Sequence, residues 1–273
     1  MPRIDLHLHS TWSDGTLTPD ELVQRARKRG VSVMALCDHD TMDGVPAFLA
    51  SCRKHSIRGI AGIELSAQYP KEMHILGYRL RPSDEAFERF LETIRRGRTE
   101  RNEAMCARLR SLGVRITMED LAEEAGGELI ARPHMARVMV SKGYVPDAKT
   151  AFMRYIGSSS PAYVERYRPS PGECIGAIRC AGGVAVLAHP FHTADRVDEI
   201  RKILAGLKEL GLWGVECLSS HHSAEQSFQL LSAAKDLGLY TTAGSDFHEE
   251  GVPDIGVDVS EDFLPWARLG VAL

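Results

Sequence analysis

The sequence predicts an α/β protein in which helices surround a parallel sheet. Seven short segments have the length and the Val, Ile, Leu, Ala and Gly content of buried strands. Helical patterns separate most of these segments, and such alternation is typical of a parallel sheet with outer helices. The expected strands cover residues 2–9, 31–37, 57–64, 72–79, 184–188, 213–217 and 239–244.

The first helix has clear signals at both ends. Thr18 occupies an N-cap position, Pro19 the first helical position, and two acidic residues follow in the first turn. The basic run 27–29 then precedes Gly30, and both features are typical of a helix C-terminus. Similar patterns predict helices at 44–55, 172–181, 195–210 and 224–237.

Residues 83–170 interrupt this alternation and are expected to form a helical insertion. A long helix over 84–111 begins the segment. Shorter helices are expected at 118–124, 133–142 and 148–155. Two stretches rich in Ser, Arg and Pro then mark the return to the main domain. We therefore expect the main domain to comprise residues 1–82 and 171–273.

The composition is that of an ordinary globular protein. Apolar residues make up 44% and charged residues 26% of the 273 residues, and the net charge is −4, so contact with nucleic acid would have to be local. The six Cys form no CxxC pair, which argues against a disulfide framework and a thiolate zinc site. With no room for a signal peptide and no membrane-length apolar run, the expected compartment is the cytoplasm.

His7 and His9 are the first candidate metal ligands. Side chains alternate across a strand, so these two imidazoles point the same way, opposite to Ile4, Leu6 and Leu8. Two such imidazoles can hold a transition-metal ion if other parts of the chain supply further ligands. A strand with two solvent-facing polar residues has the same pattern, so the pair alone does not decide between these interpretations.

Further His and acidic residues occur in the loop after the first strand, on or after later strands, or, for one of them, in an Arg-Pro-His motif. They are Asp14, His39, Glu64, His74, His134, His189, Asp246 and His248. The C-terminal ends of the strands in a parallel barrel lie on one side, so these residues are expected to meet in one cleft. His and carboxylate ligands suit Mn²⁺, Fe²⁺ or Zn²⁺, and this set exceeds what one ion can use. Two or three divalent ions are therefore expected.

Six ordered motifs resemble the polymerase and histidinol phosphatase (PHP) family. They are His-Leu-His-Ser, Asp-His-Asp, Ile-Glu, Arg-Pro-His, Ala-His-Pro and Ser-Asp-Phe-His, and the resemblance covers essentially the whole chain. Their order and spacing and the long insertion are most similar to stand-alone phosphoesterases of nucleoside 3′,5′-bisphosphates and short 5′-phosphorylated oligonucleotides. The resemblance implies a distorted (β/α)7 TIM-like barrel, a helical insertion over the active-site mouth, and a metal cluster that hydrolyses phosphate esters.

The resemblance also implies how the ligands are divided among the ions. It assigns His7, His9, Glu64 and Asp246 to one ion, Glu64, His74 and His134 to a second, and Asp14, His39 and His248 to a third. Several family members have a His where this chain has Asp14, and a carboxylate there can still bind an ion. Mn²⁺ is the expected ion, with Fe²⁺ and Zn²⁺ as alternatives. Such ions would generate a hydroxide for in-line attack on phosphorus.

Residues near these motifs are candidates for contacts with a phosphate. Arg132 lies close to His134 in the sequence, and its guanidinium matches two phosphate oxygens at once. His192 lies in the loop after His189 and is a candidate to donate to the phosphate or to protonate the leaving oxygen. His189 is a candidate ligand, ligand orienter or phosphate contact. His221 either lines the cleft or lies in solvent.

The basic residues of the long helix have two interpretations. Arg95, Arg96, Arg98 and Arg101 fit the solvated face of a polar helix, which is the more usual arrangement. If the insertion closes over the barrel mouth, Arg98 or Arg101 would instead hold a second phosphate.

Three functions are compatible with these observations. The first is a metal-dependent phosphatase of nucleoside 3′,5′-bisphosphates that also acts exonucleolytically on short oligonucleotides. A histidinol-phosphate phosphatase would need an acidic pocket for the substrate amine, whereas the candidate residues are arginines. A non-catalytic PHP module would have lost metal ligands, and none of the expected positions is apolar. We therefore expect the first function, with a nucleotide as substrate and neither a membrane nor a stable protein partner.

Overall fold

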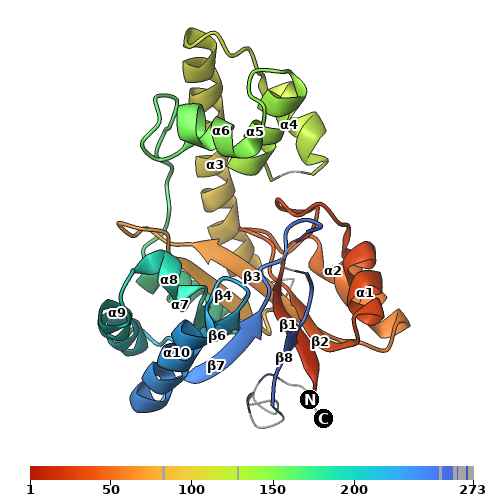
Figure 1. Ribbon diagram of the computed structural model, residues 1–273, viewed down its shortest axis with the longest axis vertical. Coiled ribbons are helices and arrows are strands. Elements are labelled where there is room, and N and C mark those ends of the chain that lie inside the picture. Colours follow the sequence, from red (N-terminus) through yellow and green to blue (C-terminus); the bar gives the residue numbers. More distant parts are fainter. Residues whose placement is uncertain (82–83, 128, 252–253, 261–262, 264–268, 270–273) are drawn as a thin grey trace.

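The computed structural model of the chain shows a barrel-like sheet with outer helices and a separate helical layer above it (Figure 1). It describes residues 1–273 except 82–83, 128, 252–253, 261–262, 264–268 and 270–273. The strands are β1 (Arg3–Leu8), β2 (Val31–Leu36), β3 (Arg58–Ser66), β4 (His74–Tyr78), β5 (Val184–Leu187), β6 (Gly214–Ser219), β7 (Tyr240–Gly244) and β8 (Val257–Asp258). The expected α/β class and TIM-like barrel are confirmed.

The sheet order is β7-β6-β5-β4-β3-β2-β1-β8, and β1 also lies beside β7. There the Asp246 N–H donates to the His7 carbonyl oxygen at 2.9 Å, so the sheet is nearly closed. The expectation of a wholly parallel sheet is wrong at β4, which runs antiparallel to both β3 and β5. Only residues 67–73 join β3 to β4, and a parallel crossover needs a dozen residues or more. The two-residue strand β8 is too short to give a sequence pattern.

Helices cover the outside of this sheet on two sides (Figure 1). They are α1 (Pro19–Lys28), α2 (Val45–Lys54), α7 (Pro171–Cys180), α8 (Pro190–Thr193), α9 (Val197–Glu209) and α10 (Ala224–Leu237). Thr18 caps α1 as expected, since its side chain accepts from the Glu21 N–H and the Glu21 side chain accepts from the Thr18 N–H. In the described part of the chain, none of the helices combines the length and apolar character that crossing a membrane requires.

Two apolar clusters fill the main body. One lies between strands and helices, and the other lies inside the barrel, where the Tyr78 hydroxyl donates to the Leu6 carbonyl across the interior at 2.9 Å. Leu6 belongs to the inner cluster and Leu8 to the outer one, because the register of β1 against β2 shifts between Asp5 and Leu8. Strict alternation along β1 is therefore a wrong expectation. A register shift of this kind re-aims side chains, here next to His7.

The residues of the expected insertion form their own layer. It contains α3 (Glu85–Ser111), α4 (Met118–Ala125), α5 (Arg132–Ser141), α6 (Ala148–Ala151) and the π-helical turn η1 (Phe152–Ile156). The shorter helices pack along the far half of α3 (Figure 1) and share an apolar cluster around Leu109, Leu121 and Met135. The single helix expected at 148–155 is instead an α-helical turn followed by a π-helical turn.

Gly244 lies where β7 and β1 meet. A Cβ at this position would lie 2.3 Å from the Cβ of His7 and 3.0 Å from a Glu216 carboxylate oxygen. We expect Gly244→Ala to destabilise the protein by about 3 kcal/mol, because β1 would have to move away from β7. Equilibrium unfolding in urea measures this loss.

Gly206→Ala is the matched control. Gly206 is exposed in the interior of α9 with open space around its Cα, so alanine there should stabilise the protein by about 0.5–1 kcal/mol. A loss below about 1 kcal/mol in Gly244→Ala would contradict the close approach of the two strands.

Candidate active site

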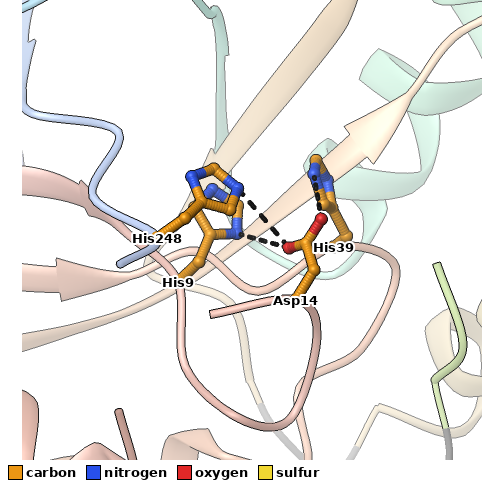
Figure 2. Close-up of side chains that lie close together, drawn as sticks. All are labelled: His9, Asp14, His39 and His248. Carbon is orange, nitrogen blue, oxygen red and sulfur yellow. Dashed lines mark ion pairs between the residues drawn. The ribbon is translucent and has the colours of Figure 1, made fainter. Parts of the chain in front are cut away.

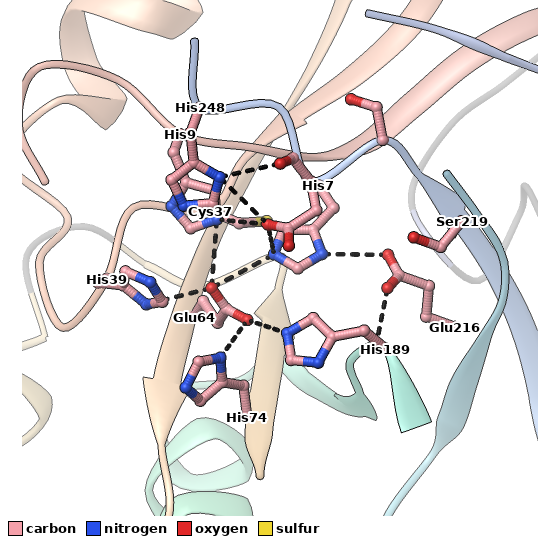
Figure 3. Close-up of polar contacts among 12 residues, drawn as sticks. His7, His9, Cys37, His39, Glu64, His74, His189, Glu216, Ser219 and His248 are labelled. Carbon is pink, nitrogen blue, oxygen red and sulfur yellow. Dashed lines mark hydrogen bonds and ion pairs between the residues drawn. The ribbon is translucent and has the colours of Figure 1, made fainter. Parts of the chain in front are cut away.

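All the candidate metal ligands except His134 meet at one end of the barrel, around Glu64 near the end of β3 (Figure 3). Glu64 is 1% exposed, and five imidazoles reach its carboxylate. Oε2 lies 3.3 Å from His7 Nε2, 3.2 Å from His9 Nε2 and 3.1 Å from His39 Nδ1, and Oε1 lies 2.9 Å from His74 Nδ1 and 3.1 Å from His189 Nε2. Burial alone would raise the pKa of Glu64, but the charges of these imidazoles hold it well below its ordinary value.

His7, His9, Glu64 and Asp246 form the first group of potential ligands. One oxygen or nitrogen from each lies within 4.8 Å of the others. His7 Nε2, His9 Nε2 and Asp246 Oδ1 are buried in the centre of this group and make no hydrogen bond. Contacts of 3.1–3.3 Å join these atoms to one another and to Glu64 Oε2. Buried polar atoms without hydrogen bonds are costly, and a divalent cation would satisfy all three. The donor set therefore fits a metal ion.

A second group surrounds Asp14 (Figure 2). Asp14 Oδ1 lies 3.4 Å from His248 Nε2 and 3.9 Å from His9 Nδ1, and Oδ2 lies 3.8 Å from His39 Nε2. Burial would raise the pKa of Asp14, but His39 and His248 outweigh it and lower that pKa well below normal. Burial lowers the pKa of His39 to about 3, so its imidazole is neutral, as metal binding requires.

Two further groups share His74: His39, Glu64 and His74 form one, and Glu72, His74 and His189 form the other, so the structure brings in His189 but not His134. His189 reaches the same Glu64 oxygen as His74. His134 belongs to none of the ligand groups in the described residues. Its Nδ1 instead accepts the Ala131 N–H at 3.0 Å, which caps the start of α5. The placement thus departs from the assignment that the resemblance implied, because His134 is committed to its own helix terminus.

Two buried carboxylates hold the loops that carry these ligands. Asp38 accepts from the Ser10 N–H at 2.7 Å, the Ser10 hydroxyl at 2.6 Å and the Ser13 hydroxyl at 2.6 Å. Asp5 accepts from the Ser245 N–H, the Ser245 hydroxyl and the Gly256 N–H at 2.6–2.9 Å. Burial raises the pKa of Asp5 to about 6 despite these bonds. The hydrogen bonds of Asp38 therefore hold the loop after His9, and those of Asp5 hold the loop that carries Asp246.

Three site residues have strained backbones. The φ angles of Asp40, His189 and Asp246 are 52°, 22° and 56°, in a region that residues other than glycine rarely adopt. All three follow the ends of strands; His189 and Asp246 there reach the ligand cluster, whereas Asp40 reaches Arg98 and Arg166. Such strain at the ends of several strands is typical of functional sites.

A cleft of about 910 Å³ opens above the Glu64 cluster. The barrel contributes its floor, and the insertion with its return segment contributes a basic wall. The wall contains Arg98, Arg101, Arg132, Arg166 and Arg168. Arg166 and Arg168 were not among the predicted site residues, although the alternating basic residues at 166 and 168 were a usable signal.

Arg98 and Arg101 are buried rather than part of a solvated face. They are 6% and 5% exposed, so the more usual interpretation of the helix is wrong for these two residues. Arg98 donates through Nε and Nη2 to Asp40 Oδ2 at 2.7 and 2.5 Å, and Arg166 Nη2 lies 3.4 Å from the same oxygen. Arg96 is exposed, as a solvated face would require.

Arg101 has no such partner. Its Nε and Nη2 are buried without a hydrogen bond. Burial lowers its pKa well below the ordinary value, and the nearby charges of Arg98 and Arg166 act in the same direction. The guanidinium of Arg132 lies over the rings of Phe152 and Tyr163, with its central carbon 5.7 and 5.5 Å from the two ring centres. An anion in the cleft would satisfy these charges.

Two further histidines lie beside the cluster. His192 does not line the cleft; its Nδ1 lies 3.4 Å from Glu72 Oε1, and its ring centre lies 4.5 Å from that of His189. His221 Nε2 lies 3.2 Å from Asp246 Oδ2, so this residue contacts the site rather than solvent alone. Glu216 was not predicted; a charged residue inside the apolar strand Gly214–Ser219 was the available signal.

The chain is similar in sequence and in fold to several known proteins. A family model described as "PHP domain" matches residues 5–175. The 3′,5′-nucleoside bisphosphate phosphatase of Chromobacterium violaceum is 34% identical over 98% of this chain and 95% of its own, and a 5′-3′ exoribonuclease of Haemophilus influenzae is 33% identical over 90% of each chain. An amidohydrolase structure from Chromobacterium violaceum, with bound sulfate and no metal, superposes with a TM-score of 0.90 at 34% identity and covers 98% of this chain and 95% of that one.

Arg101→Met should stabilise the metal-free protein. The substitution replaces an unpartnered buried charge with an apolar side chain of similar length, so we expect a gain of about 1–3 kcal/mol in the free energy of unfolding. Urea unfolding at neutral pH measures it. Arg96→Met, at an exposed position of the same helix, should change stability by less than about 0.5 kcal/mol. Destabilisation by Arg101→Met would show that a contact satisfies Arg101 without a ligand.

Proposed function

The chain belongs to the PHP domain family, and we propose that it removes a terminal phosphate from nucleoside 3′,5′-bisphosphates. It is a metal-dependent phosphoesterase, and the same site would act on the ends of short 5′-phosphorylated oligonucleotides. One observation carries the proposal: a single cleft joins the Glu64 ligand cluster to a wall of five arginines, of which Arg98 and Arg101 are buried. The first suits hydrolysis of a phosphate ester, and the second suits a substrate with a further phosphate.

The ligand groups support sites for up to three ions. We assign His7, His9, Glu64 and Asp246 to one ion and Asp14, His39 and His248 to another. We assign Glu64, His74 and His189 to a further ion, because both imidazoles reach the same Glu64 oxygen, Oε1. Imidazole and carboxylate ligands suit Mn²⁺, with Fe²⁺ and Zn²⁺ as alternatives. When bound, such ions lower the pKa of the attacking water and neutralise charge on the phosphoryl oxygens.

The arginines of the insertion would hold the second phosphate. Arg101 offers two donors that no group in the described part of the chain satisfies, and Arg132 is oriented by the two aromatic rings beneath it. Arg98 is tied to Asp40, so we assign it to positioning the wall while it adds positive charge. This arrangement would place the scissile phosphate over Glu64 and the second phosphate against the insertion.

The roles of the remaining polar residues follow from their distance to the cluster. His189 would act as a metal ligand through Nε2, which faces Glu64. His192 packs against the His189 ring outside the cleft lining, which favours a supporting role over protonation of the leaving oxygen. All six cysteines are unpaired, which agrees with a reducing compartment such as the cytoplasm.

The two other candidate functions fit the site less well. Histidinol phosphate carries an amine, yet the cleft wall opposite the cluster is built from arginines, and Arg168 pairs with Glu165, one of the acids in the lining. A non-catalytic module has no need of several overlapping ligand groups around buried atoms that make no hydrogen bond in the described part of the chain. Neither alternative accounts for both halves of the cleft.

Steady-state kinetics with Mn²⁺ test the substrate. We expect kcat/KM for a nucleoside 3′,5′-bisphosphate to exceed that for nucleoside monophosphates and histidinol phosphate by about 100-fold, because a second phosphate gains charge-assisted hydrogen bonds. Arg101→Met should lose most of this preference and leave hydrolysis of the monophosphates nearly unchanged. Equal rates on all substrates, or equal losses on all of them in Arg101→Met, would rule out the bisphosphate assignment.

Metal content tests the placement of His189. After saturation with Mn²⁺ and removal of free ion, His189→Ala should retain about one ion fewer per chain than the wild-type protein, since Glu64 and His74 alone would hold that ion weakly. His134→Ala should retain the wild-type number, because its imidazole caps α5. Elemental analysis gives both counts. The opposite result would restore His134 as the ligand.

A further inference from the structure

Glu216 is a buried acid that none of the ligand groups contains. It lies in β6 between the apolar residues Val215 and Cys217 and is 0% exposed. Figure 3 shows its side chain between His7 and His189. A carboxylate removed from water in this way requires strong partners, so its contacts indicate its role.

Each carboxylate oxygen of Glu216 contacts a different residue of the site. Oε1 lies 3.1 Å from Nδ1 of the His7 ring. Oε2 accepts the backbone N–H of His189 at 2.9 Å. His189 has the strained φ of 22°, so this hydrogen bond holds a backbone turn that would otherwise relax. One side chain therefore fixes both a ring from β1 and a turn after β5.

The contact with His7 decides which nitrogen faces the cluster. When Nδ1–H donates to Glu216, the lone pair of Nε2 points toward Glu64 Oε2 at 3.3 Å and Asp246 Oδ1 at 3.2 Å. Metal-bound histidines commonly donate their second N–H to a carboxylate, which fixes the ring and makes it a stronger ligand. The absence of a side chain at Gly244 leaves room for Glu216 and His7 together.

We propose that Glu216 is a positioning residue that sets the geometry of two neighbouring metal sites at once. It holds the His7 ring in the form that presents Nε2 to the first site, and it holds His189 so that its Nε2 reaches the second. The proposal rests on the proposed function in that His7 and His189 are taken as metal ligands.

Glu216→Gln is the sharpest test, because the amide has the same shape but only one acceptor oxygen. The native carboxylate receives two N–H donors, so one of them must face the amide NH₂ in the variant. We expect the metal-free variant to unfold within about 3 °C of the wild-type protein. Calorimetric titration with Mn²⁺ alone should show about 10–100-fold weaker binding.

Thr242→Val is the matched control. Thr242 is fully buried and pairs in register with Glu216 across β6 and β7, but no ligand contact depends on it. The affinity of the Thr242→Val variant for Mn²⁺ should equal that of the wild-type protein.

Glu216→Ala supplies a spectroscopic readout. With ¹⁵N-labelled histidine and Zn²⁺ in place of Mn²⁺, the hydrogen-bonded Nδ1–H resonance of His7 should be present in the wild-type protein and absent in the variant.

The outcomes separate this proposal from the proposed function. Wild-type affinity for Mn²⁺ in Glu216→Gln would overturn the positioning role, as would an equal loss of affinity in Thr242→Val, which would indicate a general effect of packing. A wild-type protein that binds no Mn²⁺ would overturn the metal dependence itself, and this proposal with it.

Discussion

The structure depends on one buried carboxylate, Glu64, whose two oxygens hold five imidazoles together. Four of these imidazoles lie in or next to three different strands, and the fifth follows β2. A carboxylate withdrawn from water is costly, and clustered imidazoles that carry protons repel each other. Neither the buried carboxylate nor the cluster of protonated imidazoles would be stable at this site without the other. The Glu64 charge and the imidazoles must therefore be assembled together, and the barrel is the scaffold that brings their strands to one point.

The closure of the sheet follows from this requirement. His7 on β1 and Asp246 after β7 share the first ligand group, so the first and last long strands must touch, and Gly244 permits their close approach. The reversal of β4 serves the same end. Its short link to β3 places His74 opposite Ser66 in register, beside Glu64, without an intervening helix. The strained backbones of His189 and Asp246 show where a regular strand would not bring the side chain to the ligand cluster.

The sequence predicts most of the strands and the outer helices, because the spacing of apolar residues and the helix caps are local signals. It also predicts that the ligands gather in one cleft, because the C-terminal ends of parallel strands lie on the same side of a barrel. The direction of β4 depends on the length of the connection between β3 and β4, and the residue pattern of a strand carries no information about its direction. His134 and His189 both lie in well-defined motifs, and only three-dimensional placement shows that the first caps its own helix. The burial of Arg101 depends on how the insertion closes, which no property of the helix pattern determines.

The basic wall is a second departure from what stability alone would favour. The protein has a net charge of −4, yet five arginines line one cleft, and Asp40 is the carboxylate that ties two of them. Their mutual repulsion and the unpartnered donors of Arg101 oppose folding in the absence of a ligand. Metal ions on the floor of the cleft would add positive charge to the same space. Once ions occupy the floor, both halves of the cleft would favour an anion, and the two phosphates of the proposed substrate would reach both.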